Sequence, residues 1–197
     1  MVLNYNKDNI INLISLINES CCCINSDFKG NSSINLSKNI HSVTSNESFN
    51  SILISYLNYL NTEFLVSTNF IEISKQGLRT RIKERNSISI KLKHYKEIEI
   101  EKGSFSFNRC LNDLMGFRVI ISNLLINENE IKSILDYLKE QKIIWRWYLR
   151  TDGLYKGYHC YFKLDNFSFP WELQLWDSEW ENDNIKDHER HENEKMC

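Results

Sequence analysis

Hydrophobic side chains recur at steps of three and four residues in several parts of the chain, which is the pattern of amphipathic helices. The segments with this spacing are 8–19, about 47–65, 86–96 and 128–141. The last has a clear start, because Asn127 can cap it and Glu130 follows three residues later. The charged tail, 178–195, predicts a solvated helix, whereas residues 24–47 are rich in Asn and Ser and predict a loop or linker.

Strands are expected at 117–122, 143–149, 158–164 and 167–176. Alternation is clearest in the last segment, where Leu173 and Leu175 fall on one face and Glu172 and Gln174 on the other. Glu172 should therefore leave the sheet on the face opposite a helix layer. Helices interleaved with strands predict an α/β or α+β fold with a mixed β-sheet flanked by helices.

The length of 197 residues and the hydrophobic share of 42% predict one compact domain with a real core. We expect residues 1–47 to form an amino-terminal helix and linker, and residues 48–197 to form the domain itself. Lys and Arg number 24 against 26 Asp and Glu, so the net charge of -2 gives no global attraction to nucleic acid.

Six cysteines are present, and three of them, Cys21, Cys22 and Cys23, are consecutive. This is not a disulfide framework, and no secretory signal or membrane span precedes it. Adjacent cysteines also lack the spacing of a zinc site, although that alternative stays open. The sequence therefore predicts a protein of the reducing cytoplasm.

Two carboxylates are the strongest candidates for chemistry. Asp113 stands before Gly116 at the start of a strand, where it suits Mg²⁺ held by one or two carboxylates and substrate phosphates. Glu172 lies within a strand, where a charge is costly to bury unless it is paired or metal-bound. The alternatives are a turn aspartate that caps local amides and a glutamate on a wet face.

Basic and aromatic residues complete the candidate site. The run Arg79-Thr80-Arg81-Ile82-Lys83 is followed by Ser87 and Lys91, a spacing that can form a phosphate cradle, and arginine can also lie flat on a base. Tyr158 follows Gly157 and could stack on a purine. The alternatives are a solvated charge run and a core or rim tyrosine. We interpret His159, which points the opposite way from Tyr158, as structural.

Four segments in this order resemble the synthetase domain of the RelA/SpoT alarmone synthetases, over roughly residues 50–195. They are Arg81-Ile82-Lys83 with Ser87 and Lys91, then 113–118 (DLMGFR), Gly157-Tyr158, and 172–175 (ELQL). The chain looks most like the small, single-domain members, some of which act as toxins. The resemblance implies a nucleotidyltransferase-like fold and Mg²⁺-dependent transfer of pyrophosphate from ATP to a nucleotide 3′-hydroxyl.

The resemblance also implies roles by matched position. Asp113 and Glu172 would hold Mg²⁺, and Glu172 would help to activate the acceptor hydroxyl. Tyr158 would stack on the acceptor guanine, and Arg81 would lie against the ATP adenine. The remaining matched residues would contact the nucleotides or support their site: Arg79, Lys83, Ser87, Lys91, Arg118, Gln174, Asn184 and His188.

Two departures affect the acceptor. Phe162 and Trp176 stand where many members carry histidine and arginine, so donors for the acceptor's phosphates are lost. The leading acceptor is GDP or GTP. The alternatives are the tRNA 3′ end, which a basic patch at Lys139, Lys142, Arg146 and Arg150 could contact, adenosine alarmones, or an inactive nucleotide-binding module. Small members often form homo-oligomers or pair with an antitoxin.

Overall fold

The computed structural model describes residues 2–28, 34–97 and 102–194 and contains a six-stranded mixed sheet. The strands are β1 (Val2–Asn4), β2 (Arg79–Ile82), β3 (Met115–Ser122), β4 (Arg146–Asp152), β5 (Tyr155–Phe162) and β6 (Trp171–Asp177). Their order is β1-β3-β6-β5-β4, and β2 also pairs with β3. The predicted mixed sheet flanked by helices is confirmed.

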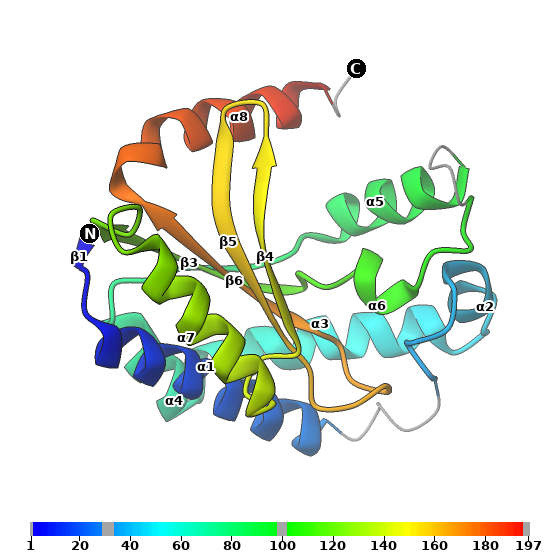
Figure 1. The fold of residues 1–197 in the computed structure, drawn as a ribbon. Helices are drawn as coiled ribbons and strands as arrows, with labels where there is room; N and C mark the ends of the chain where they lie inside the picture. Colours follow the sequence, from blue (N-terminus) through cyan, green and yellow to red (C-terminus); the bar gives the residue numbers. More distant parts are fainter. Residues whose placement is uncertain (1, 29–33, 98–101, 195–197) are drawn as a thin grey trace.

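Most helices cover one face of the sheet or extend from its ends. The helices are α1 (Lys7–Asp27), α2 (Ile40–Thr44), α3 (Phe49–Val66), α4 (Thr68–Lys75), α5 (Arg85–Glu97), α6 (Phe107–Cys110), α7 (Glu128–Glu140) and α8 (Glu181–Glu194), with a 3-10 turn, η2 (Ser178–Trp180), before α8. Helix α8 packs through Ile185 against Ile120, Tyr155 and Trp176 on the opposite face. Helix α1 contacts α4, α7 and β5, so these helices form one layer against the sheet (Figure 1). No described helix has the length and apolar character needed to span a membrane.

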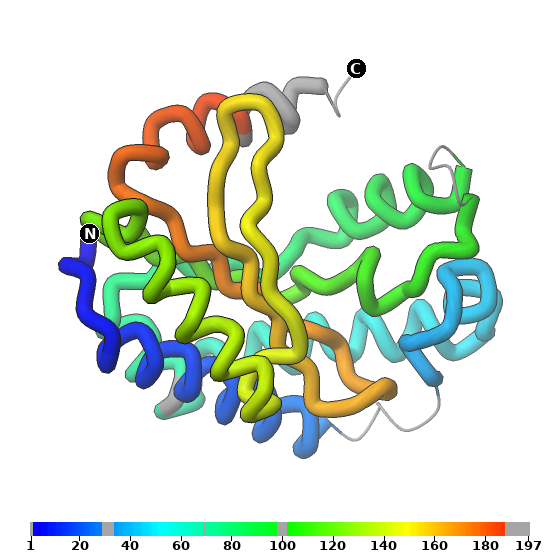
Figure 2. Tube along the Cα trace, viewed as in Figure 1, coloured from blue at the N-terminus to red at the C-terminus, as the bar shows by residue number. Residues whose placement is uncertain are grey.

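Parallel and antiparallel pairings meet at the centre of the sheet. Strands β3 and β6 are far apart in the sequence but run side by side in parallel (Figure 2). Strand β5 pairs antiparallel with β6 on one edge and with β4 on the other, and β2 pairs antiparallel with the first half of β3. Of the two carboxylates expected to act together, Glu172 therefore lies in β6 and Asp113 just before its neighbour β3.

The face toward α1, α4 and α7 is apolar. Leu173 and Leu175 of β6 are fully buried there, as are Tyr158 and Cys160 of β5. Trp171 also belongs to this core, and its indole N–H donates to the Tyr56 hydroxyl at 2.8 Å, which satisfies its polar atom. The opposite face consequently receives the polar side chains of the same strands.

The described part of residues 1–47 shares this core with the segment that follows. Ile14 and Ile17 of α1 are fully buried in the same cluster as the β6 leucines. The loop predicted at 24–47 is wrong in part, because α1 continues to Asp27 and the short helix α2 is present. Apolar side chains within the Asn- and Ser-rich sequence explain the difference, since Leu36 and Ile40 are buried against the rest of the fold.

Candidate active site

Two rows of side chains cross five strands on the polar face of the sheet. The first row follows the strand register from β2 through β3, β6 and β5 to β4: Arg81, Gly116, Glu172, Tyr161 and Arg146. Glu172 lies at its centre and an arginine stands at each end. Among the described residues, neither Arg81 nor Arg146 has a carboxylate within ion-pair distance, so both charges remain available to anions.

The second row lies beside the first on the same face, two residues away along each strand. Its members are Arg79, Arg118, Gln174, His159 and Tyr148. Together the two rows place cations on the β2 side, the carboxylate in the middle and aromatic rings on the β4 side. A cleft of about 270 Å³ opens over the β2 end of both rows. Its walls include Arg79, Arg81, Arg118, Glu172 and Gln174.

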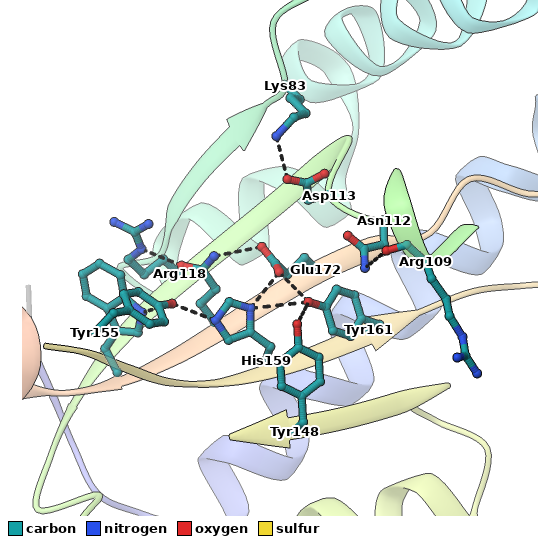
Figure 3. Close-up of polar contacts among 12 residues, drawn as sticks. Lys83, Arg109, Asn112, Asp113, Arg118, Tyr148, Tyr155, His159, Tyr161 and Glu172 are labelled. Atoms are coloured by element: carbon teal, nitrogen blue, oxygen red, sulfur yellow. Dashed lines mark hydrogen bonds and ion pairs between the residues drawn. The ribbon is translucent and has the colours of Figure 1, made fainter. Parts of the chain in front are cut away.

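Glu172 is held as a buried carboxylate by three donors (Figure 3). Its Oε1 accepts from His159 Nδ1 at 2.8 Å and from the Tyr161 hydroxyl at 2.9 Å, and its Oε2 accepts from Gln174 Nε2 at 2.8 Å. Burial raises the pKa of Glu172, but His159 and the Gln174 amide outweigh burial and leave this pKa well below its usual range. A carboxylate has about four lone-pair positions, so one on Oε2 remains for a ligand.

Asp113 lies just before β3, in contact with two lysines. Its Oδ2 accepts from Lys83 Nζ at 2.6 Å, and its Oδ1 accepts from Lys91 Nζ at 3.1 Å. Burial raises the pKa of Asp113, but the two ammonium groups outweigh it and lower this pKa. The lysines come from the end of β2 and from α5, so α5 delivers positive charge to the mouth of β3.

The charge of Glu172 acts on the ionisation of Asp113 and of Lys91. The negative charge of Glu172 contributes to raising the pKa of Asp113 and that of Lys91. For Lys91, burial lowers the pKa, but Asp113, Cys110 and Glu172 outweigh it and the pKa is raised. Lys91 is therefore a stable cation that is paired with Asp113 and further stabilised by the charge of Glu172.

The donor set can be compared with what Mg²⁺ requires. In the described part of the chain, no group of three or more His, Cys, Asp or Glu side chains could hold a metal by itself. Magnesium usually takes only one or two carboxylates and completes its shell with water and substrate phosphates. Asp113 and Glu172 each keep free acceptor capacity, so the residues fit an ion that arrives with a nucleotide.

Arg118 belongs to the same network. Its Nε donates to Gln174 Oε1 at 3.0 Å, and its guanidinium lies 3.7 Å from the centre of the Trp176 ring. Burial lowers the pKa of Arg118 to about 10. Gln174 thus hydrogen-bonds to both Arg118 and Glu172, and the Trp176 ring makes a cation–π contact with the Arg118 guanidinium.

A solved structure similar to this chain is that of a small alarmone synthetase. It is the crystal structure of the small alarmone synthetase 2 from Bacillus subtilis, with 18% identity over 77% of this chain and 84% of that chain, and a TM-score of 0.41. No protein-family model matches the chain, and no curated protein matches it. A similarity with this TM-score carries no argument about the function of this chain.

The structure brings most of the expected site residues together. Arg79, Arg81, Arg118, Glu172 and Gln174 line the cleft, and Lys83 and Lys91 reach Asp113 at the mouth of β3. Ser87 is exposed on α5, one helical turn before Lys91, so it lies on the same side of that helix. Arg79 also pairs with Glu181 of α8 at 3.0 Å.

Tyr158 requires a correction. Its side chain is fully buried on the apolar face, opposite Leu175 in the register, with the Trp147 ring 6.2 Å away. Adjacent residues of a strand point to opposite faces, so a Tyr158 ring packed in the core cannot stack on a base near Glu172 in this conformation. Phe162 faces the same core and is also fully buried.

Asn184 and His188, the two matched residues in α8, have different positions. The Asn184 side chain is buried and hydrogen-bonds to the backbone N–H and C=O of Lys156, at 2.8 and 2.6 Å. It joins α8 to β5, which is a structural role. The side chain of His188 lies outside the described residues.

Sequence reasoning missed the residues that hold Glu172. His159 was interpreted as structural, yet its ring lies between Glu172 and the Tyr155 hydroxyl, which is 2.7 Å from Nε2. Tyr161 donates directly to the carboxylate. The signal was present in the alternation of β5, which placed both side chains opposite Tyr158, but only the pairing of β5 with β6 shows that this face is the one with Glu172.

Gly157 leaves space for the Trp176 indole. A Cβ added there would lie 2.9 Å from Trp176 Cδ1 and 3.1 Å from the Tyr155 hydroxyl. We expect Gly157→Ala to lower the free energy of unfolding by about 1–3 kcal/mol, because the buried indole must shift. Thermal and urea unfolding measure the change. Gly116→Ala is the matched control, since its Cβ would meet only the Arg81 carbonyl at an ordinary 3.8 Å. Equal stability of Gly157→Ala and the wild type would contradict the packing.

Acid stability reports the environment of Glu172. Because its folded pKa lies below the unfolded value of about 4.3, the unfolded state binds more protons as the pH falls, and the stability contributed by Glu172 is lost between about pH 5 and its folded pKa. We therefore expect Glu172→Gln to lose less stability than the wild type between about pH 6 and pH 3.5 in urea titrations. Glu47→Gln, at an exposed position before α3, is the control. A wild-type loss no greater than that of Glu172→Gln would show that the carboxylate is not held as described.

Proposed function

We propose that the protein transfers pyrophosphate from ATP to the 3′-hydroxyl of GDP or GTP, and so makes a guanosine alarmone. The observation that carries the proposal is the position of Asp113 and Glu172. Asp113 lies two residues before β3, and Glu172 is the second residue of the parallel neighbour β6. Glu172 also lines a cleft that contains three arginines. The order of the sequence motifs, which resembles that of the alarmone synthetases, supports the same chemistry.

The β2 side of the cleft suits the triphosphate donor. Arg79, Arg81 and Arg118 line it. Lys83, which directly follows β2, and Lys91 are paired with Asp113 just before β3. Phosphoryl-type transfer depends mainly on positioning and on neutralising charge, which clustered cations provide. Mg²⁺ held by Asp113 and Glu172 would withdraw further charge from the phosphates.

Glu172 is placed to receive the acceptor hydroxyl. In the reaction, the 3′-oxygen of the acceptor bonds to the β-phosphorus of ATP. The bond from this phosphorus to the oxygen of the α-phosphate breaks, and AMP leaves. The free acceptor position on Glu172 Oε2 can take the hydroxyl hydrogen bond, and the hydroxyl proton passes to this oxygen as the new bond forms and then to solvent. A metal ion on the same oxygen would take the position of the Gln174 donor. The low pKa of Glu172 keeps it ionised at neutral pH, so the group orients and polarises the hydroxyl without first losing a proton.

The test is an acceptor survey. The protein is incubated with Mg²⁺ and ATP labelled in the γ-phosphate, together with GDP, GTP, AMP or deacylated tRNA. We expect label on GDP or GTP, with one AMP formed for each product. Label on tRNA alone, or on AMP alone, would replace the proposal with the corresponding toxic activity. No label on any acceptor would indicate a nucleotide-binding module.

A further inference from the structure

The burial of Tyr158 leaves the acceptor base without the aromatic partner that the sequence motif suggested. The aromatic ring that the second row presents on the Glu172 face is Tyr148 of β4, which is 38% exposed. Strand β4 is the last strand in the sheet order on this side. We therefore considered what the β4 end of the two rows can bind.

The Tyr148 ring is fixed in place by two neighbours. It stacks on the buried His159 ring with a centroid distance of 5.5 Å and an angle of 7° between the planes. Its hydroxyl is 3.0 Å from the Tyr161 hydroxyl (Figure 3). His159 covers the inner face of the ring, and no described strand lies beyond β4, so the outer face of the ring points away from the sheet.

The position of Tyr148 relative to Glu172 suits an acceptor. Tyr148 contacts the Tyr161 hydroxyl, and that hydroxyl donates to Glu172 Oε1, so the ring is two hydrogen bonds from the carboxylate. It also lies across Glu172 from the arginines of the donor cleft. In an in-line transfer the attacking hydroxyl approaches from the side opposite the leaving group, so the acceptor belongs on the β4 side.

A cation stands next to Tyr148. Arg146, two residues earlier on the same strand face, lies 4.3 Å from the centre of the Tyr161 ring and has no carboxylate partner among the described residues. Arg150, on the other side of Tyr148, is paired with Asp152 at 2.9 Å. Arg146 is thus the cation of this strand that remains for an anion.

We propose that Tyr148 and Arg146 form the acceptor subsite, with a purine base on the outer face of the Tyr148 ring and the 5′-phosphates of the acceptor on Arg146. This inference rests on the proposed function, since it names where the acceptor of that reaction binds. It also explains how the site can take a nucleotide acceptor while Tyr158 and Phe162 stay in the core.

Binding without turnover tests the subsite. Labelled GDP and labelled AMP are equilibrated with the protein by dialysis, in the presence of an ATP analogue with a methylene bridge between the α- and β-phosphates. We expect Tyr148→Ala to weaken binding of the acceptor nucleotide about tenfold, within the range for loss of one base–aromatic stack. Tyr148→Phe keeps the ring and should bind within about twofold of the wild type.

Two control variants are informative. One separates recognition of the base from recognition of the phosphates, and the other tests whether any exposed tyrosine would have the same effect. Arg146→Gln should weaken binding of GDP but leave guanosine unchanged, because guanosine has no phosphate. Tyr137→Ala removes an exposed tyrosine of α7 on the other side of the sheet and should leave binding unchanged. Unchanged binding in Tyr148→Ala, equal weakening in Tyr148→Phe, or no binding of either nucleotide would overturn the subsite.

The acceptor survey distinguishes this inference from the function on which it rests. If the wild type transfers pyrophosphate and Tyr148→Ala keeps the same KM for the acceptor, the subsite is wrong and the function stands. If Tyr148 governs nucleotide binding but no acceptor gains label, the subsite stands and the transfer reaction is wrong.

Discussion

Replacing Glu172 with glutamine should reduce the rate of pyrophosphate transfer by about 10²–10⁴-fold, the contribution of a general base. Glutamine keeps the size of the side chain but presents an amide in place of the charged Oε2 that faces the acceptor hydroxyl. The hydrogen bond from Gln174 and the donors His159 and Tyr161 would then surround a neutral group. We expect most of the loss in kcat and a smaller rise in the KM for MgATP, because Glu172 is also proposed to hold the metal while the arginines of the donor cleft are untouched.

The measurement is initial rates of AMP release with the acceptor that the survey identifies. Circular dichroism and urea unfolding at neutral pH must show that Glu172→Gln is folded. Glu47→Gln, at an exposed position far from Glu172 in the sequence, is the control and should retain the wild-type rate. Activity of Glu172→Gln within about tenfold of the wild type would remove this carboxylate from the mechanism.

Replacing Asp113 with asparagine should lower the rate by roughly three orders of magnitude, which corresponds to about 4 kcal/mol. Two effects combine. The site loses one of the two carboxylates proposed to hold Mg²⁺, and Lys83 and Lys91 lose the negative charge with which both are paired. An asparagine can still accept a hydrogen bond, but it does not neutralise a cation.

The metal dependence of the variant identifies the cause. If Asp113 binds the metal, activity that remains in Asp113→Asn should require a higher concentration of Mg²⁺, and the KM for MgATP should rise. Asp27→Asn, at an exposed position at the end of α1, is the matched control. A loss of rate with an unchanged Mg²⁺ requirement would mean that Asp113 only positions the two lysines.

The periodic patterns predicted most of the fold. The helices near 47–65, 86–96 and 128–141 and the strands near 117–122 and 167–176 occur close to their expected positions. Strand β2 was missed because its sequence, Arg-Thr-Arg-Ile, lacks the apolar run of a buried strand. It pairs with β3 at the edge of the sheet, where polar side chains are tolerated. The sequence pattern therefore indicated a charged run but not the strand that carries it.

The site was harder to predict than the fold because its contacts are long-range. Alternation correctly separated Tyr158 from His159 and Leu173 from Glu172, but the spacing within one strand does not show which face lies over the cleft. The pairing of β5 with β6 decides that His159 and Tyr161 hold Glu172. The pairing of β3 with β6 likewise places Gly116, three residues after Asp113, opposite Glu172.

The ion pairs of Asp113 with two lysines were also not predicted from the sequence. Lys83 and Lys91 were expected to meet phosphates, and the structure shows both in ion pairs with the carboxylate instead. Charge neutralisation of a buried acid explains these contacts, because an unpaired buried carboxylate is costly. Both interpretations apply if the ammonium groups contact Asp113 and the phosphates together.

The central claim is that Asp113 and Glu172 hold one divalent ion together with the donor nucleotide. Crystals grown with Mn²⁺ and the methylene-bridged ATP analogue test this most directly, through the anomalous scattering of manganese. We predict an anomalous peak between the two carboxylates, with the phosphates of the analogue on the β2 side beside Arg81 and Lys83. A peak bound by neither carboxylate, or an analogue bound outside the cleft, would contradict the account.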